Sequence, residues 1–130
     1  MALKSRIPQV RAAITQEMDR FVLRVANSIR NNAVEAIMRG QKSGRMYGNH
    51  RASAPGEAPA TDTGALVRSI RVEHTPGTGT ARVVVGAEYA AKLEFGTRTI
   101  APRPFLRPAV AKTRRQMPEL AKSITIKVGK

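Results

Sequence analysis

A stripe of apolar residues in the first third of this 130-residue chain constrains its fold more than any other feature. The apolar positions recur at steps of three and four, at Ile7, Val10, Ile14, Met18, Phe21, Val25, Ile29, Ala33 or Val34, and Ile37. This spacing predicts one long amphipathic α-helix over residues 7–39. Ser5 suits the N-cap, Pro8 is tolerated in the first turn, and Gly40 is a suitable stop.

A helix of this length is too long for a small domain to cover. At 1.5 Å per residue it extends roughly 48 Å, which exceeds the diameter of a small globular domain. We therefore expect part of its apolar stripe to need a neighbouring subunit, or the helix to kink.

The chain is strongly basic, with 23 Lys and Arg residues, 9 Asp and Glu residues and a formal net charge of +14. The polar face of the predicted helix carries Arg11, Arg20, Arg24, Arg30 and Arg39, which suit either a solvated face or a phosphate-binding face. A second basic group near the C-terminus comprises Arg107, Lys112, Arg114, Arg115, Lys122, Lys127 and Lys130. It could contact phosphates or an acidic protein surface. Charge alone gives salt-dependent, non-specific affinity for nucleic acid, and five scattered aromatic residues do not form a stacking platform.

Composition excludes several classes of protein. The chain has no cysteine, so disulfide frameworks, thiolate nucleophiles and cysteine-based zinc sites are excluded. No apolar run approaches the roughly 18 residues of a membrane span, so we expect no membrane association of that kind. We also expect no cofactor.

The segment 41–61 reads as a long loop. It is rich in glycine, proline and basic residues and has little periodicity. Long loops in compact domains are usually functional or disordered. Two interpretations stay open: a flexible basic arm that orders against a partner, and a mobile loop that promotes solubility.

The remainder, residues 62–130, predicts a mixture of short helices and strands. Asp62 or Thr63 can cap a short helix over Gly64–Ile70, in which Leu66 and Ile70 share a face. Strands are predicted over Arg71–Thr75 and Thr80–Ala87, joined by a turn at Pro76–Gly79.

Further along, we expect a helix over Glu88–Phe95 that buries Tyr89, Leu93 and Phe95 and ends at Gly96. Two prolines stiffen an extended segment before Phe105, Pro108 opens a helix to about Ser123, and Ile124–Val128 alternates like an edge strand. The prediction is a single α+β domain over residues 1–130, with a long N-terminal helix and shorter helices packed on a small antiparallel sheet.

Catalytic chemistry has little support in the sequence. His50, His74 and Glu73 are the only candidates for an acid–base ribonuclease-like centre, and no motif brings them together. No nucleophile stands beside a suitable base. We therefore expect a protein that is not an enzyme.

Two stretches carry a resemblance to a known family. The first runs from Ser53 to Ile70 and contains Asp62, Gly64 and Leu66 in an Asp-Thr-Gly-x-Leu string. The second combines Tyr89, Glu94, Phe95, Gly96 and Thr97 with Pro104, Phe105, Leu106, Arg107 and Pro108. Together they resemble the small neck or minor tail component family of Hong Kong-type long-tailed phages, to which the minor tail protein Z of phage lambda is distantly similar. The resemblance extends over roughly Ile7 to Lys122.

This resemblance implies a structural virion protein, assembled in the host bacterial cytoplasm, that forms a six- or twelve-fold ring at the head–tail junction. Its partners would be other copies of the chain, head-closure, tail-terminator or tail-tube proteins, and DNA that passes non-specifically. We expect Arg20, Arg24, Arg114 and Arg115 to be candidates for facing that DNA. Phe105 and Leu106 would anchor either in the subunit's own core or in an adjacent protomer, and Glu94 would pair with an arginine. The alternative function is a small basic nucleic-acid-binding protein that acts alone.

Overall fold

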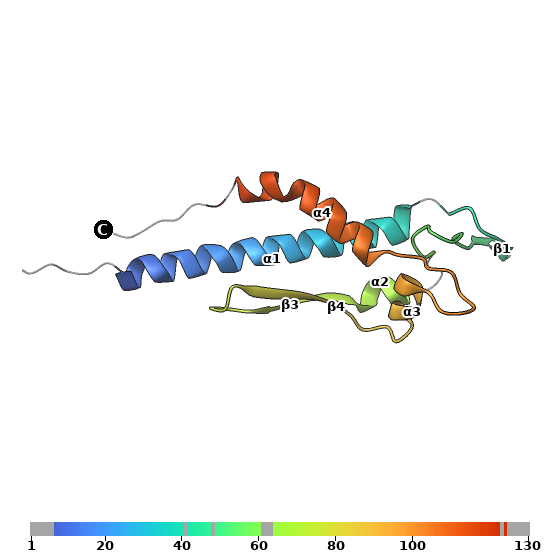
Figure 1. Ribbon diagram of the computed structural model, residues 1–130, viewed down its shortest axis with the longest axis horizontal. Helices are drawn as coiled ribbons and strands as arrows, with labels where there is room; N and C mark the ends of the chain where they lie inside the picture. Colours follow the sequence, from blue (N-terminus) through green and yellow to red (C-terminus); the bar gives the residue numbers. More distant parts are fainter. Residues whose placement is uncertain (1–6, 41, 48, 61–63, 123, 125–130) are drawn as a thin grey trace, which may run out of the picture.

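The long N-terminal helix is the axis of the molecule. In a computed structural model that describes residues 7–40, 42–47, 49–60, 64–122 and 124, α1 runs from Ile7 to Arg39. Helix α4 (Leu106–Ala121) lies along one side of α1, and an antiparallel hairpin of β3 (Ile70–Thr75) and β4 (Thr80–Val85) lies along the other (Figure 1). The predicted helix is therefore confirmed over its described length. Ser5, the expected N-cap, lies outside the described residues.

Short elements gather at the C-terminal end of α1. Helix α2 (Ala65–Ser69) leads directly into β3, and α3 (Ala90–Phe95) follows β4. A second hairpin of β1 (Met46–Tyr47) and β2 (His50–Arg51) lies at this end of the molecule, opposite the tip of the β3–β4 hairpin (Figure 1). The described chain is thus α+β, with two small antiparallel sheets where the sequence predicted one.

The register of the β3–β4 hairpin explains its burial. Ile70 pairs with Val85 and Thr75 with Thr80, across the predicted Pro76–Gly79 turn. Successive side chains of β3 alternate between the two faces, so Val72 is half-buried and its neighbour Arg71 is exposed. Val84 is half-buried on the face opposite Val83, so both faces of β4 are partly covered.

The core lies at the end of the molecule where the short elements meet. Its buried residues are Ala33, Ile37, Leu66, Ile70, Ala90, Phe105 and Ala109. Leu66 and Ile70 are both buried as predicted, but the predicted helix ends at Ser69, and Ile70 is the first residue of β3. Phe105 is only 1% exposed, so of the two anchoring sites considered for it, the subunit's own core is the one observed.

Two aromatic residues do not lie where the sequence placed them. Tyr89 is 45% exposed and Phe95 is 65% exposed, whereas the prediction buried both. Helix α3 is a single short helix whose inner face is formed by Ala90, Leu93 and Glu94. Phe95 therefore points outward, where the guanidinium of Arg107 lies 4.8 Å from its ring centroid.

Segment 41–61 is more ordered than a plain loop. Besides β1 and β2, it contains Glu57, whose carboxylate accepts hydrogen bonds from the backbone N–H groups of Ser43 at 2.9 Å and Ala54 at 2.7 Å. The Ser43 hydroxyl adds a third at 3.0 Å. These bonds lower the pKa of Glu57, the one from Ala54 most of all. The segment also binds the rest of the subunit, because Gly56 N–H donates to the Pro102 carbonyl at 2.9 Å.

The C-terminal part differs from the prediction in its bounds. Helix α4 begins at Leu106, two residues before Pro108, and continues through Pro118. The predicted strand Ile124–Val128 lies outside the described residues apart from Ile124, which is not in a strand. Among the described helices, none is both long and apolar enough to cross a bilayer.

Candidate functional site

The strongest polar cluster in the described structure is centred on Glu94. This residue is 5% exposed, yet its carboxylate accepts hydrogen bonds from three successive backbone N–H groups. Phe105 donates to Oε2 at 2.8 Å, Leu106 to Oε2 at 3.0 Å, and Arg107 to Oε1 at 2.7 Å. These N–H groups belong to the first turn of α4, where a helix has no internal acceptors. Glu94 therefore caps α4 from another helix, and we call this arrangement the Glu94 clamp.

Arg107 completes the Glu94 clamp from the solvent side. Its Nε lies 3.4 Å from Glu94 Oε1, and its Nη2 donates to the Glu94 backbone carbonyl at 3.2 Å. The expected pairing of Glu94 with an arginine is thus confirmed. Burial by itself raises the pKa of Glu94, but the hydrogen bonds from Leu106, Phe105 and Arg107 outweigh it and lower the pKa below its ordinary value.

The turn between α3 and α4 holds the Glu94 clamp in place. Gly96 has φ +74°, and a Cβ there would lie 2.8 Å from the Ile100 carbonyl oxygen. Thr97 closes the turn: its N–H donates to Ile100 O at 2.8 Å, and its hydroxyl accepts the Ile100 N–H at 3.1 Å. Arg103 N–H then donates to the Leu93 carbonyl at 2.6 Å, which returns the chain toward α3. The family-like string therefore encodes a folding device, and its polar groups bond one another.

The other motif residues have mixed placements. Leu66 is buried, Gly64 adopts φ +77° at the N-terminus of α2, and Asp62 lies outside the described residues. Pro104 and Leu106 are half-buried, while Pro108 is exposed on the first turn of α4.

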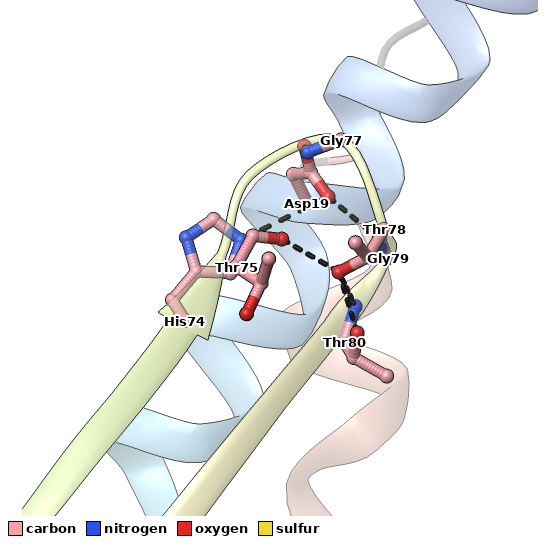
Figure 2. Close-up of polar contacts among 7 residues, drawn as sticks. All are labelled: Asp19, His74, Thr75, Gly77, Thr78, Gly79 and Thr80. Atoms are coloured by element: carbon pink, nitrogen blue, oxygen red, sulfur yellow. Dashed lines mark hydrogen bonds and ion pairs between the residues drawn. The ribbon is translucent and has the colours of Figure 1, made fainter.

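A second carboxylate, Asp19, holds the tip of the β3–β4 hairpin against α1. Figure 2 shows its side chain reaching into the turn, where Oδ2 accepts the Gly77 N–H at 2.7 Å and Oδ1 accepts the Gly79 N–H at 2.8 Å. The Gly77 bond is the largest cause that lowers the pKa of Asp19. Nε2 of His74 lies 3.8 Å from Oδ1 and is buried without a hydrogen-bond partner among the described residues. Sequence analysis assigned Asp19 no role.

The candidate catalytic residues do not form a centre. His50 lies in β2 and His74 near the tip of β3, at opposite ends of the molecule (Figure 1). Glu73 faces away from both on exposed sheet surface, where it pairs with Arg71 at 3.4 Å. In the ranges that the structure describes, no three His, Asp or Glu side chains gather in a way that could hold a metal ion.

The arginines proposed to face DNA fall into two pairs. Arg20 bonds Glu17 at 2.8 Å, and Arg24 donates to the Leu120 carbonyl at 3.4 Å, so both take part in contacts within the subunit. Arg114 and Arg115 are exposed on α4 and form no hydrogen bond or ion pair with any described residue. Of the four, Arg114 and Arg115 are the ones whose charge stays available to an external phosphate.

The described residues cover the N-terminal half of α1 less than its C-terminal half. The buried residues of α1 are Ala26, Ala33 and Ile37, all in its C-terminal half. By contrast, Ile7 is 65% exposed, Ile14 42% and Met18 45%. We call residues 7–18, which are the outer part of this N-terminal half, the protruding half of α1. Among the described residues, the core covers only the C-terminal part of α1, and the expectation that its stripe needs a neighbouring subunit stays a prediction.

Beside the protruding half lies an apolar groove with a volume of about 460 Å³. Its floor is α1, one wall is β4 and the other wall is α4. Six representative lining residues are Val25, Ile29, Ala81, Val83, Val110 and Met117, and all are half-buried. An exposed apolar helix face and an apolar groove on one small chain form a pair of surfaces suited to protein–protein contact.

Comparison with known proteins adds no relative: no family model, curated protein or solved structure matches the chain.

Proposed function

We propose that this chain is a structural component of a tailed-phage virion that forms a ring at the head–tail junction, around the conduit through which DNA leaves the capsid. The observation that carries the proposal is the protruding half of α1. Its exposed apolar stripe suits burial against other protein, and a free monomer would leave it in water. The resemblance of the Tyr89-to-Pro108 string to the phage neck family supplies the kind of assembly.

The motif residues fit a structural role. In the Glu94 clamp every polar group of the carboxylate is bonded within the subunit, and its neighbours are a buried phenylalanine and backbone amides. Such a site has no group left over for substrate chemistry. It instead fixes α4 against α3 and so sets the shape of the subunit.

The charge is consistent with an assembly around DNA. Six copies at +14 each gather about 84 positive charges around one axis. Such a field attracts phosphates without reading bases. Arg114 and Arg115 are the exposed residues through which we expect α4 to contribute to it.

The alternative is a basic nucleic-acid-binding protein that acts alone. Arg114 and Arg115, which are exposed and pair with no described residue, favour it as a second candidate. Light scattering after size exclusion, combined with negative-stain imaging, separates the two. The ring proposal predicts particles with a central hole and a mass that is a multiple of 14.1 kDa. A strict monomer that binds DNA tightly would support the alternative.

The phage role needs its own test. A phage that carries this gene should, when the gene is deleted, accumulate DNA-filled heads and separate tails. Supplying the chain in trans should restore joined particles. Normal joining without the chain would refute the proposed role, whatever the oligomeric state.

A further inference from the structure

Within the described part of the chain, other elements contact α1 only along part of its length. The hairpin tip is held by Asp19, and the last turn of α4 is reached by Arg24, which donates to the Leu120 carbonyl. The protruding half, residues 7–18, begins where these contacts end. Figure 1 shows this end of α1 extending past both α4 and the hairpin.

The protruding half and the floor of the apolar groove carry the same pattern. The stripe Ile7, Val10, Ile14 and Met18 recurs eleven residues later as Met18, Phe21, Val25 and Ile29, of which the last three line the groove. Eleven residues are close to three full helical turns, so the two sets lie on one face of α1. A helix with this spacing presents its side chains as regular anchors for an apolar groove.

From this match we propose that the protruding half of α1 in one copy docks in the apolar groove of the next copy, head to tail. The inference rests on the proposed ring function and names the surfaces through which the ring would assemble. Each copy then offers one helix half and one groove. Heterologous contacts of this kind give a ring when the rotation between successive copies closes and an open filament when it does not, and the proposed function requires the closed form.

In the head-to-tail docking, the two α1 helices are parallel and staggered by eleven residues. Charge favours this arrangement over a two-fold dimer. A two-fold arrangement of residues 7–18 against residues 18–29 is centred on Met18, and it brings Glu17 of each copy to the level of the other copy's Asp19. Like charges at that spacing repel. A stagger of eleven residues instead brings Glu17 and Asp19 to the level of Ser28 and Arg30, which are neutral and basic.

The size of the contact also points to an assembly of many copies. Twelve helical residues are about 18 Å long and about 10 Å wide, so docking would bury roughly 400 Å² in total. A stable protein pair needs about 1,200 Å² or more. One contact is therefore too small for a stable dimer, whereas a closed ring lets every copy use both surfaces at high effective concentration.

Engineered cysteines test the docking directly, because the chain has none of its own. We expect the double variant Met18→Cys/Met117→Cys, oxidised at high protein concentration, to give a ladder of dimers, trimers and larger species on a non-reducing gel. The eleven-residue stagger brings Met18 of one copy to the level of Ile29 of the next, and Met117 lines the groove near that level, because Asn32 bonds Thr113 and Gln116 of α4. The matched control is Met18→Cys/Glu119→Cys, since Glu119 is an exposed neighbour of Met117 and does not line the groove. We expect it to cross-link at least tenfold less.

Each other outcome overturns the inference. Products that stop at the dimer would show reciprocal two-fold docking. Equal cross-linking of both double variants would show random collision, and no cross-linking of the Met117 variant would show that the groove is not the acceptor. Circular dichroism of both variants establishes that they are folded. If microscopy shows rings but the cysteine pair does not cross-link, this interface is refuted and the ring function is not. If the pair gives the ladder but head–tail joining is normal without the chain, the proposed function is refuted and the interface is not.

Discussion

Removal of the Glu94 carboxylate tests the physical account of the fold most sharply. The variant Glu94→Ala leaves the backbone N–H groups of Phe105, Leu106 and Arg107 without their acceptor. Each hydrogen bond to a carboxylate contributes about 1.5 kcal/mol or more, which gives roughly 4–5 kcal/mol for three. Relief of the carboxylate's own burial offsets part of this, so we expect a net loss of about 3 kcal/mol. The variant Glu94→Gln keeps one acceptor oxygen and should lose about 2 kcal/mol.

Urea and thermal unfolding followed by circular dichroism measure this loss. At roughly 3–5 °C per kcal/mol for a domain of this size, Glu94→Ala should melt about 10 °C or more below the wild type. Glu119→Gln is the matched control, because Glu119 belongs to α4, the helix that Glu94 caps, and pairs with Lys122, but its side chain is 75% exposed. We expect it to change stability by less than about 0.5 kcal/mol. A Glu94→Ala variant within about 1 kcal/mol of the control would refute the Glu94 clamp.

Three further predictions follow from the same contacts. Hydrogen bonds hold the folded pKa of Glu94 below its ordinary 4.5, so its stabilising effect is full above that value and is lost as the pH falls through the folded pKa. The free energy of unfolding between pH 6 and pH 3 should therefore depend less on pH for Glu94→Gln than for the wild type, and identical profiles would contradict this. Phe105→Ala removes a side chain that is 1% exposed and should cost about 3–5 kcal/mol in urea unfolding; a folded, equally stable variant would show that Phe105 is not a core residue. Gly96→Ala places a Cβ 2.8 Å from Ile100 O, whereas Gly56→Ala, also at positive φ, meets nothing within 4 Å. The first should therefore lower the melting temperature clearly more than the second, and equal shifts would count against a tight turn at Gly96.

The elements that sequence analysis predicted correctly are those with local signals. The period of the stripe from Ile7 to Ile37 depends only on neighbouring residues, and so does the Pro76–Gly79 turn between two apolar strands. The excess length of α1 also followed from arithmetic alone. Its consequence, an exposed stripe at Ile7, Ile14 and Met18, is seen in the structure.

The errors arise where a contact joins distant parts of the chain. Aromatic residues are usually buried, so we predicted that Tyr89 and Phe95 are buried, whereas α3 buries Glu94. Burial of that carboxylate is possible only because the first turn of α4, eleven to thirteen residues later, supplies three donors. No local pattern encodes that meeting.

Asp19 shows the same limit over a longer separation. It lies on α1, 58 residues before Gly77 and 60 before Gly79. Within the sequence it is one more polar residue on an amphipathic helix. Only the packing of the hairpin against α1 reveals that it binds the turn (Figure 2). Folding back of segment 41–61 through Glu57 and Gly56 is likewise a long-range property.

The central claim is that copies of this chain assemble through the protruding half of α1. The most direct measurement is the molar mass by light scattering, over a series of protein concentrations, of the wild type and of Ile14→Glu, which places a charge on the exposed stripe. The account predicts that the wild type reaches a closed ring, with a mass of about 85 kDa for six copies of 14.1 kDa or twice that for twelve, and that Ile14→Glu stays monomeric while folded. A wild type that remains at 14.1 kDa at the highest concentration, or a variant that assembles equally well, would contradict it.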